Sequence, residues 1–324
     1  MLSLHARLIR WIPSLLSYVV LLAVLAGSAI ALRHDLGQLS LVALVRSRDL
    51  VAGAAALSLL NYTFRILRWR FYLFRLGHTV SRTFAAWTYI AGFAYTLSPG
   101  KVGEIMRARY YLPLGIPLKD VTAAFVAERL MDVLAMIVLA GGLILASGHY
   151  TALAAGAAAV ALTGLAVLAL VPWNRAQAAW AGNERLPAML RRALSGLAAT
   201  LASTRPLLRP TVLAVGFAAA FLAWGMEGLG LGVLANLFPA LPLSATGAVG
   251  IYAAAVIIGA VSFLPGGLGT TEAVMTALLV SAGYPPPAAF IVTLLCRLVT
   301  LWLAVGLGWI AVLVLRYRTT TVMT

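Results

Sequence analysis

The sequence has few charged residues, and few of those are acidic. Only 10% of its 324 residues are charged, and nine acidic residues stand against 24 basic ones, which gives a net charge of +15. Soluble domains have about 25% charged and about 45–50% apolar residues, whereas this chain is 62% hydrophobic. Its mean hydropathy is +0.98. The composition excludes a water-soluble globular protein and predicts an all-α polytopic membrane protein that favours anionic lipid.

Other absences exclude several kinds of chemistry. The single cysteine, Cys296, cannot form an intramolecular disulfide. The four histidines lie in predicted loops without metal-ligand spacing, and no phosphate-binding loop, serine-hydrolase motif or dinucleotide-binding motif stands in a usable context. We therefore expect no metal and no cofactor. Because the basic residues line a predicted membrane face, we also expect no nucleic acid partner.

Long apolar runs dominate the rest of the chain. A membrane-spanning helix needs about 20 apolar residues. The runs that predict full spans are 14–32, 50–73, 120–147, 151–171, 211–236 and 288–315. The first is longer than the apolar part of a secretory signal, so we interpret it as a retained span. Two further apolar stretches, 83–112 and 245–282, are interrupted by Pro-Gly clusters, and each predicts a re-entrant, broken helical hairpin.

The distribution of lysine and arginine predicts that both termini are cytoplasmic. With this orientation, 19 of the 24 basic residues lie on the inside, and the loops 148–150, 237–244 and 283–287 on the outside carry none. The long inner loop, 173–209, has leucines at helical spacing with arginines between them. The leucines are Leu186, Leu190, Leu194, Leu197 and Leu201. This pattern predicts an interfacial helix resting on anionic headgroups.

The two interrupted stretches match each other along the single transmembrane domain, 1–324. Pro99-Gly100 is followed by a glutamate, as is Pro265-Gly266, and Arg129 corresponds to Arg297 at an offset of 168 residues. The expected hairpin tips are Pro99, Gly100, Gly103, Pro265, Gly266, Gly267 and Gly269. Matching proline, glycine, glutamate and arginine predict a repeat, 49–147 and 210–316. The charge distribution predicts that the copies are inverted, which is typical of secondary transporters with a site where the repeats meet.

Ionisable residues within the apolar segments are the candidate binding residues. Each costs about 2.5–3.5 kcal/mol at the centre of a membrane helix, so such residues mark sites or form interior ion pairs. The predicted substrate-binding residues are Glu104, Arg107, Glu128, Arg129, Asp132, Glu272 and Arg297. Glu128 and Asp132 share one helical face. Arg297 has no acid at helical spacing, which predicts Glu272 or a ligand anion as its partner. Ion pairs that only hold the helices together remain the alternative.

A second group of arginines lies at the predicted cytoplasmic end of the span 50–73. Arg65, Arg68 and Arg75, with Tyr72, fall on one helical face. They predict contacts with a lipid phosphate. A positively charged anchor beside the neighbouring aromatic residues explains the same pattern equally well.

These features together resemble the family of lysylphosphatidylglycerol synthase transmembrane regions, a group of flippase-like integral membrane proteins. The resemblance extends over residues 65–316. It is carried by Arg68-Trp69, by Ser98-Pro99-Gly100-Lys101-Val102-Gly103-Glu104 with Arg107, by Glu128-Arg129 with Asp132, by Leu264-Pro265-Gly266-Gly267-Leu268-Gly269 with Glu272, and by Arg297. The resemblance implies movement of a lipid with a charged or bulky headgroup between leaflets, the lipid being a phospholipid, an aminoacylated lipid, a polyprenyl-linked lipid or a hopanoid.

The sequence predicts a lipid flippase of the bacterial cytoplasmic membrane rather than an enzyme. Because the chain ends at Thr324, we expect no soluble synthase domain and no aminoacyl transfer by this chain alone. The expected partners are membrane lipids with anionic or aminoacylated headgroups, together with a lipid synthase or glycosyltransferase. Two alternatives stay open: an intramembrane enzyme resembling polyprenyl-diphosphate phosphatases, and a non-transporting membrane partner of a glycosyltransferase or lipid synthase.

Overall fold

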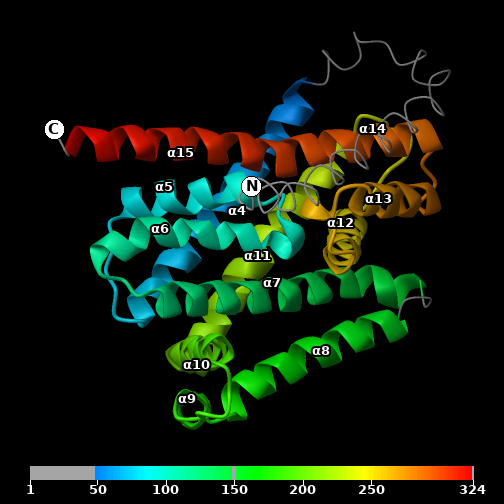
Figure 1. The fold of residues 1–324 in the computed structure, drawn as a ribbon. Coiled ribbons are helices and arrows are strands. Elements are labelled where there is room, and N and C mark those ends of the chain that lie inside the picture. The colour runs from blue at the N-terminus through cyan, green and yellow to red at the C-terminus, as the bar shows by residue number, and fades with distance from the viewer. Residues whose placement is uncertain (1–47, 148–150, 323–324) are drawn as a thin grey trace, which may run out of the picture. The chain divides into compact units, whose positions relative to one another are not determined.

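The described part of the chain is built from helices. The structure, a computed structural model, describes residues 48–147 and 151–322, and none of these residues forms a strand (Figure 1). The all-α prediction is therefore confirmed for this part of the chain. The predicted span 14–32 and the N-terminus lie outside the described residues.

Several helices are long enough and apolar enough to cross a membrane. They are α4 (Arg48–Arg75), α11 (Pro210–Ala235) and a continuous helical segment, Pro286–Tyr317. A fourth span is obtained if Ala158–Leu170 and Trp173–Ala181, which are bent by 70°, are counted as one. Three or four candidate spans support a polytopic membrane protein, and the count of six stays a prediction.

The last membrane segment contains an irregular turn. It consists of α14 (Pro286–Arg297), a π-helical turn (Leu298–Trp302) and α15 (Leu303–Val322). Further along, Gly308 lies against the backbone of Phe93 and Ala94, where a Cβ atom would collide with main-chain atoms. A glycine therefore lets this helix approach another main chain closely.

The first interrupted stretch, predicted to be a broken helical hairpin, continues as a 3₁₀ helix from its Pro-Gly cluster. After α5 (Arg82–Gly92) come a 3₁₀ turn (Phe93–Tyr95), a 3₁₀ helix (Pro99–Arg107), α6 (Ala108–Tyr111) and a second 3₁₀ turn (Leu112–Leu114). Proline is tolerated because it stands at the first position, where its missing N–H has no helical partner to lose. Nine residues is long for a 3₁₀ helix, which is typical of a hinge or a strained segment.

The second interrupted stretch is a broken helical hairpin. It runs from α12 (Ala245–Val261) through a short 3₁₀ turn (Pro265–Gly267) to α13 (Thr270–Ser281). Gly266 and Gly267 have φ angles of 62° and 66°, in the left-handed region that glycine adopts without steric cost. Two consecutive left-handed residues break the helix at the tip, between α12 and α13.

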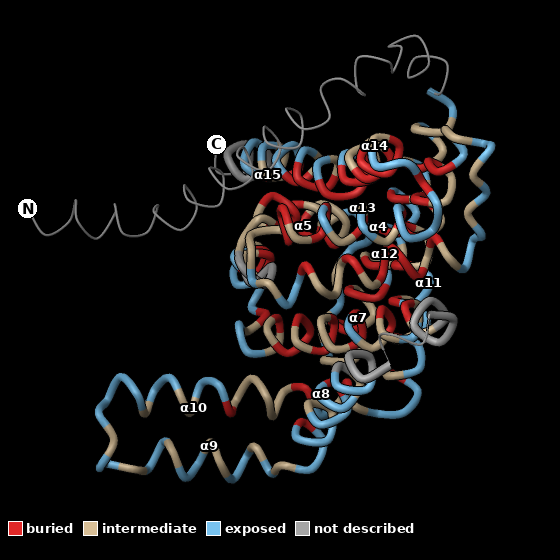
Figure 2. The backbone as a smooth tube through the Cα atoms, turned by 90° about the vertical axis from the view of Figure 1, so that its right-hand side faces the viewer, coloured by how far each residue is buried: buried red, intermediate tan, exposed pale blue. Residues whose placement is uncertain are grey.

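The long loop folds as two helices, where the leucine pattern predicted one. α9 (Trp173–Ala181) and α10 (Ala188–Ser203) form an antiparallel pair (Figure 2). Leu186 lies before α10 because Pro187 immediately precedes the first helical residue, whereas the other leucines of the pattern belong to α10. The helical spacing was thus correct from residue 188 onward.

Contacts divide the chain into two compact units. Among the described residues, the first unit contains 48–60, 93–104 and 225–310. The second contains 61–92, 105–147, 151–224 and 311–322. In the second unit, α7 (Leu118–Ser147) packs against α8 (Thr151–Leu170) and against α10. Neither unit coincides with one predicted repeat, because each takes segments from both halves of the sequence.

Both Pro-Gly clusters belong to the first unit. Leu97, two residues before Pro99, packs against a small apolar cluster of Leu268, Leu301 and Val305. A Cβ atom on Gly266 would lie 2.9 Å from Leu97 Cδ2. The chain just before the first cluster therefore contacts the tip of the second hairpin.

Candidate functional site

The centre of the candidate site is a pair of carboxylates on α7. Glu128 and Asp132 are four residues apart, so they point from the same side of the helix. Their residues are 0% and 2% exposed. Two carboxylates removed from water are tolerated only when cations and hydrogen-bond donors surround them.

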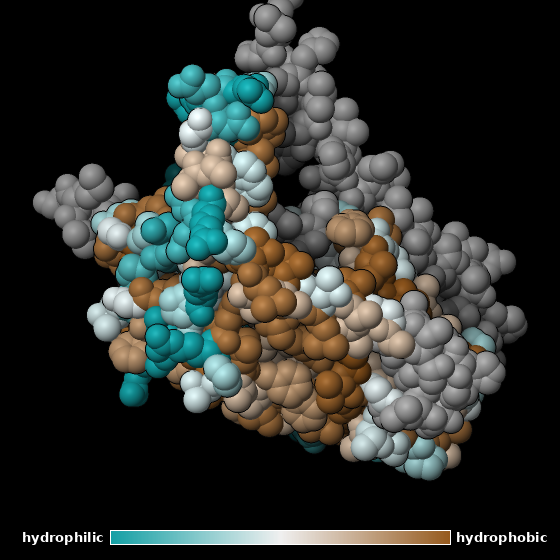
Figure 3. Space-filling view, turned by 90° about the horizontal axis from the view of Figure 1, so that it is seen from below, coloured by the Kyte–Doolittle hydropathy of each residue, from teal (hydrophilic) through white to brown (hydrophobic). Residues whose placement is uncertain are grey.

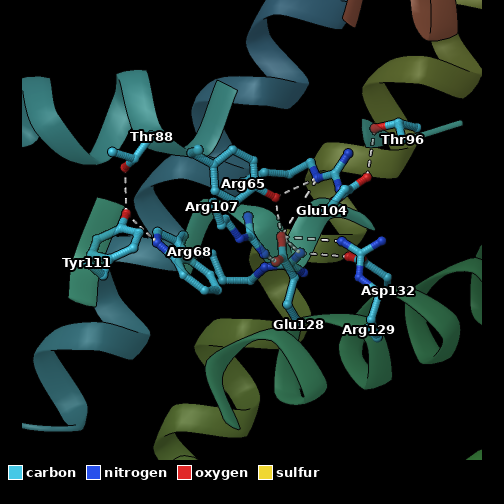
Figure 4. A network of polar contacts seen from close by, with 12 residues as sticks. Arg65, Arg68, Thr88, Thr96, Glu104, Arg107, Tyr111, Glu128, Arg129 and Asp132 are labelled. Atoms are coloured by element: carbon cyan, nitrogen blue, oxygen red, sulfur yellow. Dashed lines mark hydrogen bonds and ion pairs between the residues drawn. The ribbon is translucent and has the colours of Figure 1, made fainter. Parts of the chain in front are cut away.

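Arginines from three segments of the second unit supply these cations (Figure 4). Arg68 of α4 approaches Glu128 at 3.2 Å and Asp132 at 2.7 Å through Nη2. Arg107, at the end of the 3₁₀ helix, places Nη2 2.5 Å from Glu128 Oε2. Arg129 contacts Asp132 Oδ2 at 3.0 Å within α7 itself. Together these residues form what we call the α7 charge cluster, which also includes Arg65, with Nε 4.0 Å from Glu128 Oε1.

Aromatic side chains fix the orientation of these arginines. The guanidinium carbon of Arg107 lies 3.7 Å from the ring centroid of Trp69 and 4.5 Å from that of Tyr89, which are cation–π distances. Tyr89 Oη also donates to Glu128 and accepts from Arg65 Nε. These rings replace water around the guanidinium groups with a rigid apolar wall.

A hydrogen-bond chain supports this wall. Trp69 Nε1 donates to Tyr111 Oη at 2.8 Å, and Thr88 Oγ1 lies 2.6 Å from the same oxygen. All three residues are fully buried. Because buried indole and hydroxyl groups are costly when unpaired, the chain holds the Trp69 ring in one position beside Arg107.

The α7 charge cluster is buried except at one corner. The side chains of Arg65, Arg68 and Arg107 are 5%, 0% and 1% exposed, whereas that of Arg129 is 22% exposed. Arg129 is therefore the member of the cluster that a molecule from outside meets first.

Arg68 has hydrogen-bonding capacity left over. Its Nη2 makes both of its ion pairs, whereas Nε and Nη1 donate to no acceptor among the described residues. A guanidinium group has five N–H donors, and leaving two nitrogens of a fully buried one unsatisfied is expensive. Arg68 is thus suited to receive one more acceptor, such as a phosphate oxygen.

A second set of charges lies in the first unit, at the tip of the second hairpin. Arg297 Nε donates to Glu272 Oε1 at 2.6 Å, the pairing predicted from the sequence. Arg297 Nη2 also donates to the carbonyl oxygen of Gly266 at 2.8 Å, and Glu272 Oε2 accepts from the N–H of Gly269 at 2.6 Å. This pair, which we call the tip ion pair, satisfies backbone groups that the broken helix leaves without helical partners.

Two more acids of the first unit have hydroxyl partners. Thr96 Oγ1 donates to Glu104 Oε1 at 2.9 Å, and Tyr252 Oη donates to Glu227. Both glutamates are buried, at 1% and 5% exposure. The predicted binding residue Glu104 therefore belongs to a different unit from the α7 charge cluster.

The structure divides the predicted site residues into groups. Arg107, Glu128, Arg129 and Asp132 come together, and Glu272 with Arg297 forms a separate pair at the tip. Of the predicted tip residues, Gly103 donates its N–H to Ser98 Oγ at 2.6 Å. The side-chain contacts of Pro99 and Gly100 lie outside the described part of the structure.

The structure separates Arg75 from Arg65 and Arg68. The sequence placed the three together on one face of a helix end as phosphate contacts, and the structure buries Arg65 and Arg68 with the acids of α7. Their contact with a lipid phosphate stays a prediction. Arg75 lies half-buried in the last turn of α4 and has no described ion pair with these acids. The physical reason is that a carboxylate pair at Glu128 and Asp132 needs nearby cations, and α4 supplies them.

Sequence analysis did not identify Tyr89, Thr88, Tyr111 and Tyr252 as partners of the charged residues. Their partners are between 23 and 42 residues away in the chain. Helical spacing reports only contacts within one helix. Polar aromatic residues inside apolar segments were the one available signal, since a buried tyrosine hydroxyl needs a partner.

The model of the family described as lysylphosphatidylglycerol synthase TM region matches residues 11–308. The chain belongs to this family. Its apolar helices and this family membership make it a multi-pass membrane protein.

This chain is also similar to curated membrane proteins of Methanothermobacter thermautotrophicus. One UPF0104 membrane protein of Methanothermobacter thermautotrophicus is 30% identical over 237 residues, covering 67% of this chain and 69% of the relative. A second UPF0104 membrane protein of the same organism is 28% identical over 131 residues, covering 40% of this chain and 38% of the relative. Within the described residues, no group of three or more His, Cys, Asp or Glu side chains could hold a metal ion.

Proposed function

We propose that this protein is a lipid flippase that moves a phosphate-bearing lipid between the leaflets of a bacterial cytoplasmic membrane. The lipid phosphate is bound by Arg68, Arg107 and Arg129 of the α7 charge cluster. Family membership supports a role in membrane transport, and the chemistry of the cluster supports an anionic headgroup.

The observation that carries the proposal is the unsatisfied, fully buried guanidinium of Arg68. Its Nε and Nη1 both lack an acceptor among the described residues. Each of these nitrogens can donate a charge-assisted hydrogen bond to a phosphate oxygen. An interior ion pair that only held helices together would gain nothing from leaving these donors unsatisfied.

The rest of the α7 charge cluster supports reversible binding. Glu128 and Asp132 offset two of the four arginine charges when no lipid is present. The empty site therefore keeps a net positive charge for an anionic headgroup. Arg129, with its 22% exposed side chain, makes the first contact with an incoming headgroup. The aromatic wall of Trp69 and Tyr89 keeps Arg107 in place during this exchange.

Transport then requires that the cluster open to each leaflet in turn. We propose alternating access, in which the two inverted repeats predicted from the sequence move against each other. In this proposal Arg297 and Glu272 support the hairpin tip instead of binding phosphate, because their hydrogen bonds are engaged with each other and with the backbone. In the same proposal Glu104 binds the cationic part of a lipid headgroup or a proton.

The experiment is a flip assay with purified protein in proteoliposomes that contain fluorescent phosphatidylglycerol. A membrane-impermeant reductant quenches the outer leaflet, and the slower loss of inner-leaflet signal reports lipid movement. We expect Arg129→Gln to abolish protein-dependent movement, since it removes the first phosphate contact while keeping a polar side chain of similar length.

The matched control is Arg82→Gln, at an exposed arginine that begins α5. This variant should move lipid at the unaltered rate. Equal rates for the unaltered protein and folded Arg129→Gln would overturn the proposed site. Release of inorganic phosphate from a polyprenyl diphosphate by the purified protein would instead favour an intramembrane phosphatase.

A further inference from the structure

The α9–α10 hairpin leaves the membrane-spanning part of the second unit at a steep angle. α8 ends at Leu170, and α9 begins at Trp173 after a bend of 70°. In Figure 1, α7 lies across the view while α9 and α10 are seen end-on, and Figure 2 shows the pair extending sideways from the end of α8. If α8 crosses the bilayer, a helix bent by this angle runs close to the plane of the membrane.

One face of α10 is apolar and has no protein partner among the described residues. Its inward side, around buried Ala198, packs against α9 and α7. On the opposite side Met189, Leu190 and Leu197 are 87%, 45% and 51% exposed. At 100° per residue these three side chains fall within one stripe about 100° wide, as in helices that lie on a membrane surface.

Charge complementarity indicates what covers this stripe. The hairpin is basic. Arg191 and Arg192 follow the exposed Leu190, and Arg175 and Arg185 lie elsewhere in the hairpin, whose one acidic residue is Glu184. Figure 3 shows hydrophilic residues gathered in a band along one side of this face of the molecule, beside a broad hydrophobic surface. At 100° per residue, Arg192 borders the stripe on the side of Met189, whereas Arg191 lies on the side of Ala198. An apolar stripe bordered by an arginine, in a basic hairpin at the end of a span, fits an anionic lipid surface.

We propose that the α9–α10 hairpin docks on the anionic headgroup surface of the membrane at the end of α8. The side chains of Met189, Leu190 and Leu197 enter the boundary between headgroups and acyl chains, and Arg192 binds a headgroup phosphate. The outward face of α9, centred on Ala178 with Asn174 and Arg175, stays in water. This contact is separate from the α7 charge cluster and makes the protein sensitive to lipid composition.

The test measures where labelled positions lie in nanodiscs. With Cys296, the single and buried cysteine, replaced by alanine, an environment-sensitive fluorophore is attached at Leu197→Cys or, as the matched control, at Ala178→Cys. In nanodiscs containing phosphatidylglycerol, we expect emission from position 197 to shift to shorter wavelength. A quencher attached near the headgroup of a lipid should quench position 197, and aqueous iodide should quench position 178.

Charge is tested in the same labelled protein. Arg192→Gln should return the emission of position 197 toward that of the water-exposed control, because an arginine near an anionic surface contributes about fivefold to binding. High salt or nanodiscs of phosphatidylcholine alone should weaken docking in the unaltered hairpin. Arg82→Gln with Arg316→Gln, which removes two arginines outside the hairpin, should leave the emission unchanged.

Three outcomes would overturn the proposal. Iodide quenching of position 197 in anionic nanodiscs would place the stripe in water. Protection of this position from both quenchers would mean that a protein or a second copy covers it. Identical emission in neutral and anionic lipid would show that Arg192 does not bind a headgroup.

Discussion

The two groups of buried charges differ in what they hold. The tip ion pair of the first unit joins Glu272 to Arg297 and engages the backbone at Gly266 and Gly269. The α7 charge cluster of the second unit consists of contacts between side chains, and Arg68 keeps two nitrogens without acceptors. The tip ion pair therefore stabilises the backbone where the helix is broken, whereas the α7 charge cluster keeps hydrogen-bond donors without acceptors.

The comparison also separates two arginines that the sequence repeat equates. Arg129 and Arg297 are related by the offset of 168 residues. Arg129 is 22% exposed at the side chain and Arg297 is 7% exposed. Equivalent positions in two copies can thus take different tasks, one at an entrance and one at a turn. Substitutions around the two groups of charges should differ in how much they lower the stability of the protein.

The largest effect is expected for Glu128→Gln. Removing this carboxylate leaves Arg68 and Arg107 without their common anion in a buried site, which costs about 3–5 kcal/mol for a broken buried pair. Chemical unfolding in detergent micelles measures the loss. Glu184→Gln, at an exposed acid between α9 and α10, should change stability by no more than about 0.5 kcal/mol. A loss for Glu128→Gln as small as that of the control would contradict the proposed central role.

The same substitution at the tip, Glu272→Gln, should cost less, about 1–3 kcal/mol. Glutamine is neutral but still offers an oxygen to the N–H of Gly269, so the tip loses the ion pair and keeps a backbone contact. The same unfolding assay gives the value. A greater loss here than for Glu128→Gln would reverse the ranking of the two charge groups.

A backbone substitution at the tip comes next. Gly266→Ala forces a side chain into a left-handed conformation, costing about 1–2 kcal/mol, and brings its Cβ within 2.9 Å of Leu97. Gly164→Ala in α8, where a Cβ meets no atom within 4 Å, should be neutral or stabilising by up to about 1 kcal/mol. Thermal unfolding of both variants in the same detergent measures this contrast. Equal unfolding temperatures would argue against the strained turn.

The smallest effect is expected for Tyr111→Phe. It removes the oxygen shared by Trp69 Nε1 and Thr88 Oγ1 and should cost about 0.5–1.5 kcal/mol. Because the Trp69 ring then loses its anchor beside Arg107, lipid movement should slow more than the stability loss explains. Tyr317→Phe, at a 72% exposed tyrosine, serves as the control. Unaltered lipid movement in Tyr111→Phe would show that the wall needs no anchor.

Much of the helical framework followed from the sequence, because apolar length decides where a membrane helix runs. The predicted spans 50–73 and 211–236 lie within two residues of the observed α4 and α11 boundaries. The shared face of Glu128 and Asp132 also followed, since residues four apart in a helix point to the same side. For Arg297 the sequence left two partners open, Glu272 or a ligand anion, and the structure pairs it with Glu272.

Other parts could not be predicted from one sequence. Arg68 meets its acids across 60 and 64 residues of chain, and no periodicity relates two separate helices. Its apparent place among surface arginines arose because burial depends on what the neighbouring helices supply. The 3₁₀ helix Pro99–Arg107 was missed for a different reason: proline and glycine discourage an α-helix, but a proline at the first position permits the tighter one.

The π-helical turn between α14 and α15 determines in which direction the side chains of α15 point relative to those of α14. A π turn amounts to one residue inserted into an α-helix, and one residue rotates the following side chains by about 100°. Arg297, before the turn, is thereby directed at the hairpin tip, while Gly308, after it, meets the main chain of Phe93 and Ala94. Deleting Val299 would straighten the helix and make these two contacts mutually exclusive.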